Sequence, residues 1–137
     1  MQSILQRTAA LLLLFASASL ATALDNVALE KEPFSEQRFA ELQRDNAVIL
    51  VDVYADWCST CAKQQAVLAA YRQANPDNQF HILEVNFDQD KEQVKALRAP
   101  RQSTLLLYNG TEQYWYSVAE IREAVIFAEL DKVFSKR

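Results

Sequence analysis

Residues 51–61 read VDVYADWCSTC and contain both cysteines of the chain, Cys58 and Cys61. They overlap an apolar, β-branched run at residues 47–55 (AVILVDVYA), which predicts a strand buried on both faces. The residues that follow, 61–74 (CAKQQAVLAAYRQA), are rich in alanine and favour a helix. The two cysteines are therefore expected where a buried strand passes into a helix.

The spacing of the cysteines indicates redox chemistry. Three positions along a helix place both sulfur atoms on one side of a turn, near enough to form a disulfide. Free backbone N–H groups and the helix dipole stabilise a thiolate at such a helix start. The more exposed cysteine of such a pair attacks a partner disulfide, and the buried one releases the product. A C-x-x-C motif beside a strand–helix–strand pattern is a known signature of this activity.

Two other interpretations of the cysteines stay open from the residues alone. A structural disulfide would close a very short loop and would remove little entropy from the unfolded chain. A closed zinc site needs four ligands, whereas the chain offers two cysteines and one histidine, His81, in an expected strand. We therefore expect no metal or other cofactor in this chain alone, although two subunits could share a metal site.

The rest of the chain predicts alternating helices and strands after a polar lead-in at residues 24–33. Ser35 is expected to cap the first helix, and Asn109-Gly110 predicts a tight hairpin. Helices are expected at residues 35–45, 61–74 and 90–98 and after residue 117, and strands at 47–55, 80–87, 103–109 and 111–117. This order predicts an α/β fold with a central mixed β-sheet flanked by helices.

Two further motifs concern helix starts and the last strand. Asp90 with Gln93, and Ser117 with Glu120, resemble capping boxes. The second box is expected to open a helix lined by Ile121, Val125, Leu130, Val133 and Phe134. Alternation along the last strand is expected to place Tyr114 and Tyr116 on one face and Trp115 on the other.

Length and charge limit the class of protein. A chain of 137 residues with 50% hydrophobic residues is typical of one globular domain. Its formal net charge of −4 gives no basic face, so a nucleic-acid partner is not expected.

The N-terminal residues have the order of a bacterial secretory signal. MQSILQR carries a positive charge, and the uncharged stretch from Thr8 to Leu24 begins leucine-rich and ends in Ala21-Thr22-Ala23. We expect cleavage after Ala23, so that residues 1–23 are a signal peptide and 24–137 an exported, periplasmic domain. The alternative is an uncleaved membrane anchor, for which the stretch is short.

The chain resembles the thioredoxin superfamily from about Phe34 to Phe134. VDVYADWCSTC is similar to the family's strand–WCxxC–helix segment, and STLLLYNG (103–110) to the strand and hairpin after its cis-proline loop. YADWC is especially similar to the periplasmic-facing thioredoxin-like domain of the transmembrane reductant conductor and to exported thioredoxin-like proteins. The resemblance implies a thioredoxin fold and a thiol:disulfide oxidoreductase that acts on protein disulfides or dithiols.

The resemblance also implies roles for single residues. Cys58 matches the nucleophile, Cys61 the resolving cysteine, and Trp57 the tryptophan that shapes the site's surface. Asp52 matches the buried acid beneath the resolving cysteine. Its place in an apolar strand agrees, because burial raises the pKa of a carboxyl group and suits it to proton transfer near neutrality. The alternative is an aspartate at a strand end that faces water.

Glu84 occupies the position at which many thioredoxins have a lysine facing the buried acid. If the carboxyl groups of Glu84 and Asp52 both point inward, they would repel each other and share a proton. The alternative is that Glu84 faces solvent.

Ser103 stands before Thr104, where the family has a cis-proline, and both residues are expected to shape the site. Pro100 lies too far upstream to fill that place. A cis peptide bond without proline costs about 2.5–4 kcal/mol, so we expect Ser103 to be trans or strained. The family's loop faces the cysteines and pairs with substrate backbone, and here Ser103 adds a hydroxyl group. The family's proline also discourages metal binding at the cysteines, so its loss keeps a metal-binding alternative open.

Ser59 and Thr60 separate the cysteines and are expected to tune their redox balance. They provide neither the histidine of the strong periplasmic oxidase nor the Gly-Pro of thioredoxin. Without a cation near Cys58, strong stabilisation of a thiolate is not expected, which favours a reductase or isomerase over a primary oxidase. A membrane protein such as the transmembrane reductant conductor is a candidate electron donor. The contrasting hypothesis is a binding module that docks a protein or carries copper with little turnover.

Overall fold

The computed structural model describes residues 29–136 of the chain. The elements are, in chain order, β1 (Glu32–Pro33), α1 (Glu36–Arg44), β2 (Val48–Tyr54), α2 (Ser59–Ala74), β3 (His81–Asn86), α3 (Lys91–Ala96), β4 (Thr104–Asn109), β5 (Glu112–Val118) and α4 (Glu123–Phe134). The expected signal peptide, residues 1–23, lies outside the described residues. Within residues 29–136, no helix has the length and apolar character needed to cross a membrane.

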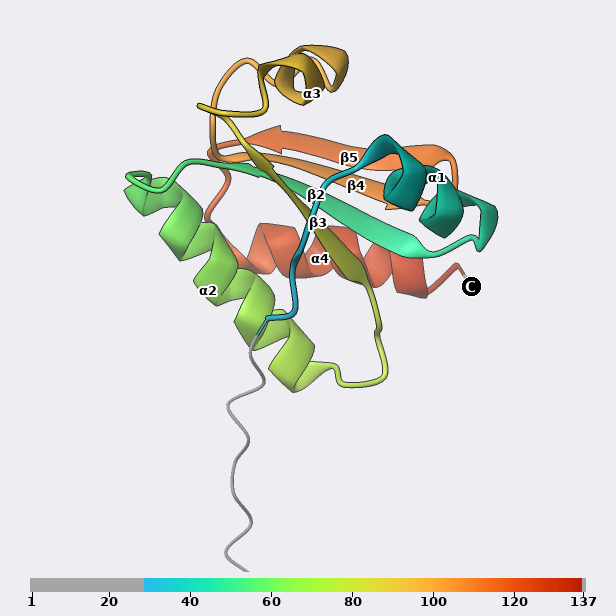
Figure 1. The fold of residues 1–137 in the computed structure, drawn as a ribbon. Coiled ribbons are helices and arrows are strands. Elements are labelled where there is room, and N and C mark those ends of the chain that lie inside the picture. The colour runs from blue at the N-terminus through green and yellow to red at the C-terminus, as the bar shows by residue number, and fades with distance from the viewer. Residues whose placement is uncertain (1–28, 137) are drawn as a thin grey trace, which may run out of the picture.

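The strands form one mixed sheet in the order β1-β3-β2-β4-β5. The central strand β2 pairs parallel with β3 on one edge and antiparallel with β4 on the other, and β5 completes the hairpin with β4. Figure 1 shows α1 and α3 on one side of this sheet and α2 and α4 on the other. The expected α/β architecture, a central mixed sheet flanked by helices, is therefore confirmed.

The central strand contributes to the hydrophobic core on both sides of the sheet. Val48 and Leu50 belong to the cluster that contains side chains of α2 and α4, whereas Ile49 and Val51 belong to the cluster with α1 and α3. Side chains alternate between the faces of a strand, and every residue from Val48 to Val53 is buried. The expectation of a strand buried on both faces is confirmed.

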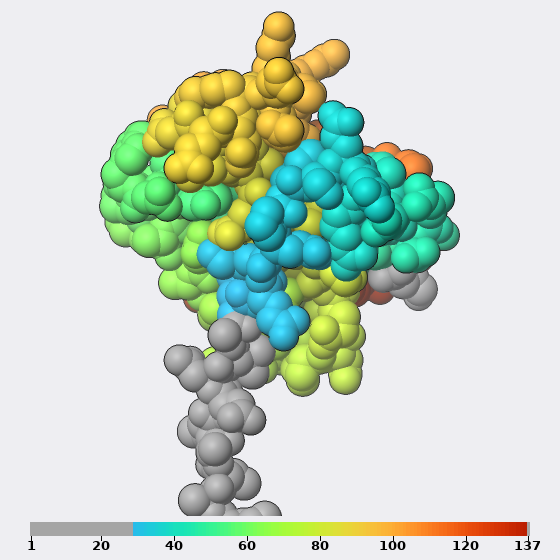
Figure 2. Space-filling model, viewed as in Figure 1, coloured from blue at the N-terminus to red at the C-terminus, as the bar shows by residue number. Residues whose placement is uncertain are grey.

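A short strand, β1, lies within the segment that was expected to be only a polar lead-in. Glu32 and Pro33 pair in parallel with Leu83 and Glu84 of β3. Two residues are too few to show a period in the sequence, so no local signal indicated this strand. This pairing places the preceding residue, Lys31, next to β3, where it forms an ion pair with Glu84. Figure 2 shows the start of the described chain, in blue, on the surface between α2 and α1.

The predicted capping box before the last helix is wrong. Ser117 lies inside β5, because this strand stays paired with β4 as far as Val118. Helix α4 begins only at Glu123. The carboxylate of Glu120 instead accepts hydrogen bonds from the backbone N–H groups of the two residues that follow it. Ile121 consequently lies outside the helix and is 40% exposed.

The predicted capping box of the third helix also does not form. Asp90 occupies the N-cap position of α3, but its side chain makes no capping hydrogen bond. Its carboxylate accepts a hydrogen bond from the backbone N–H of Asn86 at 2.7 Å. The carboxylate therefore stabilises the turn after β3 rather than the helix start. By contrast, Ser35 caps α1 as predicted, through the backbone N–H of Arg38.

The aromatic residues of β5 do not alternate as predicted. Tyr114 and Trp115 both pack against the cluster that contains α2 and α4 side chains. The register shifts within the hairpin, since Leu107 pairs with Trp115 but Tyr108 pairs with Gln113. Such an irregularity leaves one residue unpaired and turns neighbouring side chains, which places both rings on the same side.

Gly110 closes the β4–β5 hairpin and gives the first prediction. Its φ is 55°, and an added Cβ would lie 2.8 Å from Oδ1 of Asn46. We expect Gly110→Ala to lower the free energy of unfolding by about 1–2 kcal/mol, because an L-residue is disfavoured in the left-handed region. Denaturant unfolding measures this change. The matched control is Thr111→Ala at the exposed next position, expected to stay within about 0.5 kcal/mol; equal losses in both variants would contradict the argument.

Candidate active site

Cys58 and Cys61 form a disulfide at the N-terminus of α2. Cys58 is the N-cap residue, its Sγ accepts a hydrogen bond from the backbone N–H of Cys61 at 3.0 Å, and the two Cα atoms are 5.3 Å apart. Both residues are buried, and Cys58 is the more exposed at 7% against 2%. The predicted pairing at a strand-to-helix junction is confirmed.

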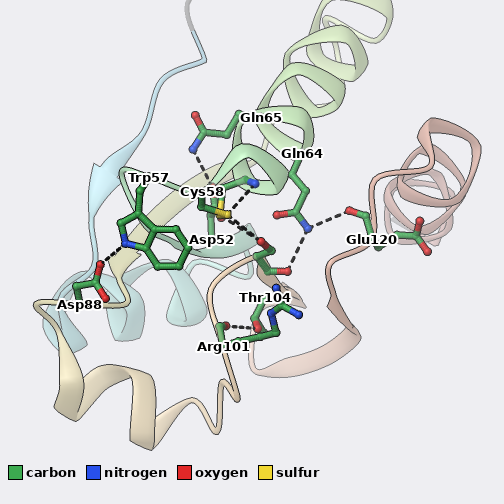
Figure 3. The surroundings of a disulfide bond; sticks show 11 residues. Asp52, Trp57, Cys58, Gln64, Gln65, Asp88, Arg101, Thr104 and Glu120 are labelled. Atoms are coloured by element: carbon green, nitrogen blue, oxygen red, sulfur yellow. Dashed lines mark hydrogen bonds between the residues drawn. A yellow bond between two sulfur atoms is a disulfide. The ribbon is translucent and has the colours of Figure 1, made fainter.

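Trp57 lies beside the disulfide, and its side chain is 66% exposed. Its indole N–H donates a hydrogen bond to Asp88 at 2.8 Å, as Figure 3 shows. Trp57 follows β2 and Asp88 follows β3, so this bond joins the two segments that leave the ends of these neighbouring strands. The residues between the cysteines, Ser59 and Thr60, begin the first turn of α2 and are exposed and half-buried, respectively.

Ser103 contacts the disulfide from the loop before β4. Its Oγ is 3.0 Å from Sγ of Cys58 and 3.3 Å from Sγ of Cys61. Residues 29–136 contain no cis peptide bond, so Ser103 is trans, as expected, and its φ is 63°. A proline could not adopt this conformation, because its ring holds φ near about −65°. The loop therefore has a different backbone from one that a cis-proline would shape.

The backbone of Ser103 is fully bonded within the protein. Its N–H donates to the carbonyl of Val53 at 2.7 Å, and its carbonyl accepts from the N–H of Ala119 at 2.8 Å. The same carbonyl accepts from Nε2 of Gln64 at 3.1 Å, and Gln64 also donates to the carbonyl of Glu120 at 2.9 Å. Figure 3 shows Gln64 reaching from α2 towards Glu120. Backbone pairing with a substrate would therefore have to use a residue other than Ser103.

Gln64 and Thr104 support this loop from the protein interior. Both are buried, and the hydroxyl of Thr104 donates to the carbonyl of Arg101 at 2.7 Å (Figure 3). Thr104 was expected to shape the site, but Gln64 was not identified from the sequence. Two adjacent glutamines in an otherwise alanine-rich helix give no local sign of which one is buried.

Asp52 lies in β2 with no exposed surface, so the alternative of a water-facing aspartate is wrong. Burial, and then the negative charge of Glu84, raise the pKa of Asp52 from 3.8 to about 7. A hydrogen bond from Nε2 of Gln65 at 3.3 Å and the charge of Lys31 act in the opposite direction. The other carboxylate oxygen, Oδ1, has no hydrogen-bond partner among the described residues.

Glu84 lies opposite Asp52 in the parallel pairing of β2 and β3. Unlike Asp52, Glu84 is not fully buried, and it has a partner of opposite charge. Its carboxylate forms an ion pair with Nζ of Lys31 at 2.6 Å and is partly exposed. Lys31 also donates to Oε1 of Gln65 at 2.9 Å. Glu84 therefore matches neither expectation fully: its charge raises the pKa of Asp52, and a lysine from another segment compensates for it.

Lys31, like Gln64, is a residue of the site that sequence reasoning missed. It lies more than twenty residues before the cysteine motif, in a segment that was expected to be a lead-in. Together with Gln65, it links Asp52 to Glu84 through side-chain hydrogen bonds. The same two residues and both cysteines line a hollow of about 240 Å³ at the surface. Solvent can therefore approach the disulfide and the polar side chains that lead to Asp52.

His81, the single histidine, does not reach the cysteines. It begins β3, whereas the cysteines follow the far end of the parallel strand β2. Its Nδ1 lies 3.9 Å from Glu32. In the part of the chain that the structure describes, no three His, Cys, Asp or Glu side chains gather in a way that could hold a metal ion.

Comparisons with known proteins agree with this geometry. The thioredoxin family profile matches residues 28–132 of the chain. The solved structure of Trxlp from Edwardsiella tarda EIB202 shares 33% sequence identity, with a TM-score of 0.68 over 74% of this chain and 98% of that chain. No curated protein matches the chain significantly.

Two more distant structures bear on the fold alone. The oxidized form of mitochondrial thioredoxin 3 from Saccharomyces cerevisiae has 20% identity and a TM-score of 0.59, over 70% of this chain and 88% of that chain. A mutant thioredoxin from Halobacterium salinarum NRC-1 has 21% identity and a TM-score of 0.63, over 74% and 87%. The expected thioredoxin fold is confirmed.

The buried carboxyl group of Asp52 gives the second prediction. The group ionises near pH 3.8 in an unfolded chain but near pH 7 in the folded protein. The folded state therefore binds the extra proton between these values, and wild-type stability falls as the pH rises through this window. We expect Asp52→Asn to gain stability relative to wild type from about pH 4 to pH 7, by up to about 4 kcal/mol.

Denaturant unfolding of the disulfide-bonded protein at several pH values measures this difference. Asp77→Asn, in the exposed turn after α2, is the matched control for the loss of one surface carboxylate. Curves of stability against pH that run parallel for wild type and Asp52→Asn would contradict the assignment of a raised pKa to Asp52.

Proposed function

The chain belongs to the thioredoxin family and is a thiol:disulfide oxidoreductase with its redox-active pair at Cys58 and Cys61, and we propose that it acts outside the cytoplasm as a reductase or isomerase of protein disulfides. The observation that carries this proposal is the disulfide at the start of α2, with the more exposed sulfur at the N-cap. Protein dithiols and disulfides are the substrate class that such a pair exchanges with.

The proposed reaction begins with the reduced pair. The Cys58 thiolate attacks one sulfur of a partner disulfide, the partner's S–S bond breaks, and a mixed disulfide forms while the released partner thiolate takes up a proton. Cys61 then loses its proton and attacks Sγ of Cys58. The mixed disulfide breaks, the second partner sulfur leaves as a thiolate and takes up a proton, and the Cys58–Cys61 disulfide of this structure remains. Two electrons pass to the partner.

Asp52 is the proposed acceptor of the Cys61 proton. A pKa of about 7 means that the carboxyl group can exchange a proton near neutral pH. Its Oδ1 has no hydrogen-bond partner within residues 29–136 and therefore has a free acceptor position. Gln65 donates to the other oxygen, and Gln65 and Lys31 both line the surface hollow beside the two cysteines. This arrangement supports transfer of the proton from Asp52 onward to solvent.

The proposed direction of electron flow rests on the charges near Cys58. The intervening residues Ser59 and Thr60 carry no charge, and Lys31, which lines the same hollow, is paired with Glu84. A thiolate that no free cation stabilises favours the disulfide form, so the dithiol form tends to give up its electrons. The cycle then needs a dithiol donor, for which a transmembrane reductant conductor is the proposed class.

The proposed location rests on the first 23 residues, which have the charged start, apolar centre and small-residue end of a secretory signal. Cleavage after Ala23 would leave a chain that begins at Leu24 and carries the whole oxidoreductase domain. An oxidising compartment outside the cytoplasm is where protein disulfides persist and where a reductase or isomerase has substrates.

A trapping experiment gives the third prediction. We expect full-length Cys61→Ala, expressed in a bacterial host and quenched with acid, to stay bonded through Cys58 to substrate proteins, because the resolving thiol is missing. Mass spectrometry of the captured complexes should find the chain beginning at Leu24, in the periplasmic fraction. The double variant Cys58→Ala/Cys61→Ala is the control and should capture nothing through a disulfide.

The function and the location are contradicted by different results. Absence of complexes, together with wild type that does not reduce a model protein disulfide when a chemical dithiol is supplied, would overturn the reductase or isomerase function. Complexes formed by a chain that retains Met1 and stays in the cytoplasm would overturn only the proposed location.

The proton-transfer role of Asp52 gives the fourth prediction. In single-turnover experiments, we expect Asp52→Asn to form the mixed disulfide at the wild-type rate but to release the product at least about tenfold more slowly near neutral pH, since a general base contributes this much or more. The deficit should shrink at high pH, where hydroxide can take the Cys61 proton. Equal slowing of both steps at every pH would instead indicate a structural defect.

A further inference from the structure

The hydroxyl group of Ser103 touches both reacting sulfur atoms, yet the reaction described above gives it no task. The side chain is fully buried, and its Oγ lies 3.0 Å from Sγ of Cys58 and 3.3 Å from Sγ of Cys61. A buried hydroxyl group this close to the reacting atoms takes part in their electrostatics in every redox state.

We propose that Ser103 is a catalytic residue whose hydroxyl donates a hydrogen bond to the Cys58 thiolate in the reduced enzyme. This inference rests on the proposed function, because it concerns the thiolate that attacks the partner disulfide. No bond to Ser103 forms or breaks. Its proton stays on Oγ while the negative charge of the thiolate is partly neutralised by the hydrogen bond.

The direction of the hydrogen bond follows from the chemistry of the two partners. The sulfur atoms of the disulfide carry no proton, so the hydroxyl group must be the donor in the oxidised structure. A disulfide sulfur is a weak acceptor, whereas a thiolate carries a full negative charge. Hydrogen bonds to charged groups are roughly twice as strong as those between neutral groups. The contact therefore stabilises the reduced, ionised pair more than the disulfide.

The hydroxyl group is held in place before the reaction starts. Three hydrogen bonds fix the backbone of Ser103, to the carbonyl of Val53, the N–H of Ala119 and the side chain of Gln64. The left-handed backbone at φ 63° is disfavoured for serine and is kept only because these bonds determine it. A donor that is already oriented loses little free energy to reorganisation when the charge develops.

Two neutral donors converge on Cys58. The backbone N–H of Cys61 is 3.0 Å from its sulfur, and the Ser103 hydroxyl approaches at the same distance from the opposite loop. Because Cys58 is only 7% exposed, water can replace these donors only in part. The two donors therefore stabilise this thiolate through hydrogen bonds alone, without the full positive charge that a neighbouring cation would bring. At 3.3 Å the same hydroxyl can also donate to Cys61 when that thiol ionises in the second step.

The test uses two substitutions that separate the hydroxyl group from the backbone. Ser103→Ala removes the hydroxyl but keeps a side chain at the disfavoured φ, whereas Ser103→Gly removes the hydroxyl and also relieves the backbone. Both are made in the Cys61→Ala protein, so that Cys58 is the only thiol. The control is Ser117→Ala, which removes a hydroxyl whose oxygen is buried and unpartnered among the described residues.

The readout is the rate of alkylation of Cys58 as a function of pH. We expect both Ser103 variants to react about tenfold more slowly than their parent near neutral pH, the effect of losing one hydrogen bond to a charged group. All rates should converge at high pH, where the thiol is fully ionised, and Ser117→Ala should follow the parent. In the two-cysteine protein, the equilibrium with glutathione should shift towards the disulfide in both Ser103 variants.

The outcomes separate the inference from the proposed function. If the pH profiles of Ser103→Ala and Ser103→Gly overlie that of the parent, the inference about Ser103 is overturned. It is also overturned if Ser103→Ala slows alkylation and Ser103→Gly does not, because that result would indicate backbone strain. Loss of rate that persists at high pH would overturn it as well, as a sign of altered access. If the parent traps partners but the Ser103 variants change nothing, only this inference fails; a parent that neither traps partners nor reduces a model disulfide contradicts the proposed function itself.

Discussion

The position of β2 is the constraint on which the rest of the structure depends. The strand is hydrogen-bonded on both edges, to parallel β3 and antiparallel β4, and packed on both faces between pairs of helices. It cannot shift its register without moving a whole set of side chains to the wrong face. The residues at its end, and the helix start that follows, consequently continue from a strand whose place in the sheet is fixed. The loop that carries Ser103 is tied to this end through Val53.

Burying a carboxyl group inside such a strand costs free energy unless neighbouring polar groups compensate for the lost water. Asp52 has no exposed surface, and its pKa is raised mainly by burial. Among residues 29–136, no basic side chain forms a direct ion pair with it. The protein supplies one amide hydrogen bond from Gln65, and places the charge of Lys31 one side chain further away, where Glu84 shares it. The result is an acid that ionises near neutrality, which a directly paired aspartate would not do.

Several features could be predicted from the sequence because each depends on neighbours in the chain. The apolar run around Val51, the helix former that follows it, and the tight turn at Gly110 are local signals, and the structure contains the elements they indicate. Where these predictions of helix caps failed, a competing contact had replaced the expected one. Pairing with β4 keeps Ser117 in a strand instead of a helix cap, and the turn after β3 takes the carboxylate of Asp90 away from α3.

The sequence by itself determined the chemistry of the centre: two cysteines three positions apart, at a junction where a buried strand becomes a helix, with an acid inside that strand. Only the tertiary structure decided what surrounds them. Lys31 reaches the site because the two residues after it, which form β1, pair with β3. Ser103 touches both sulfur atoms because the backbone hydrogen bonds of its loop hold it in a left-handed conformation. The physical reason is that covalent spacing sets which groups along one segment can react, whereas burial, pKa and hydrogen-bond donors depend on segments brought together by the sheet.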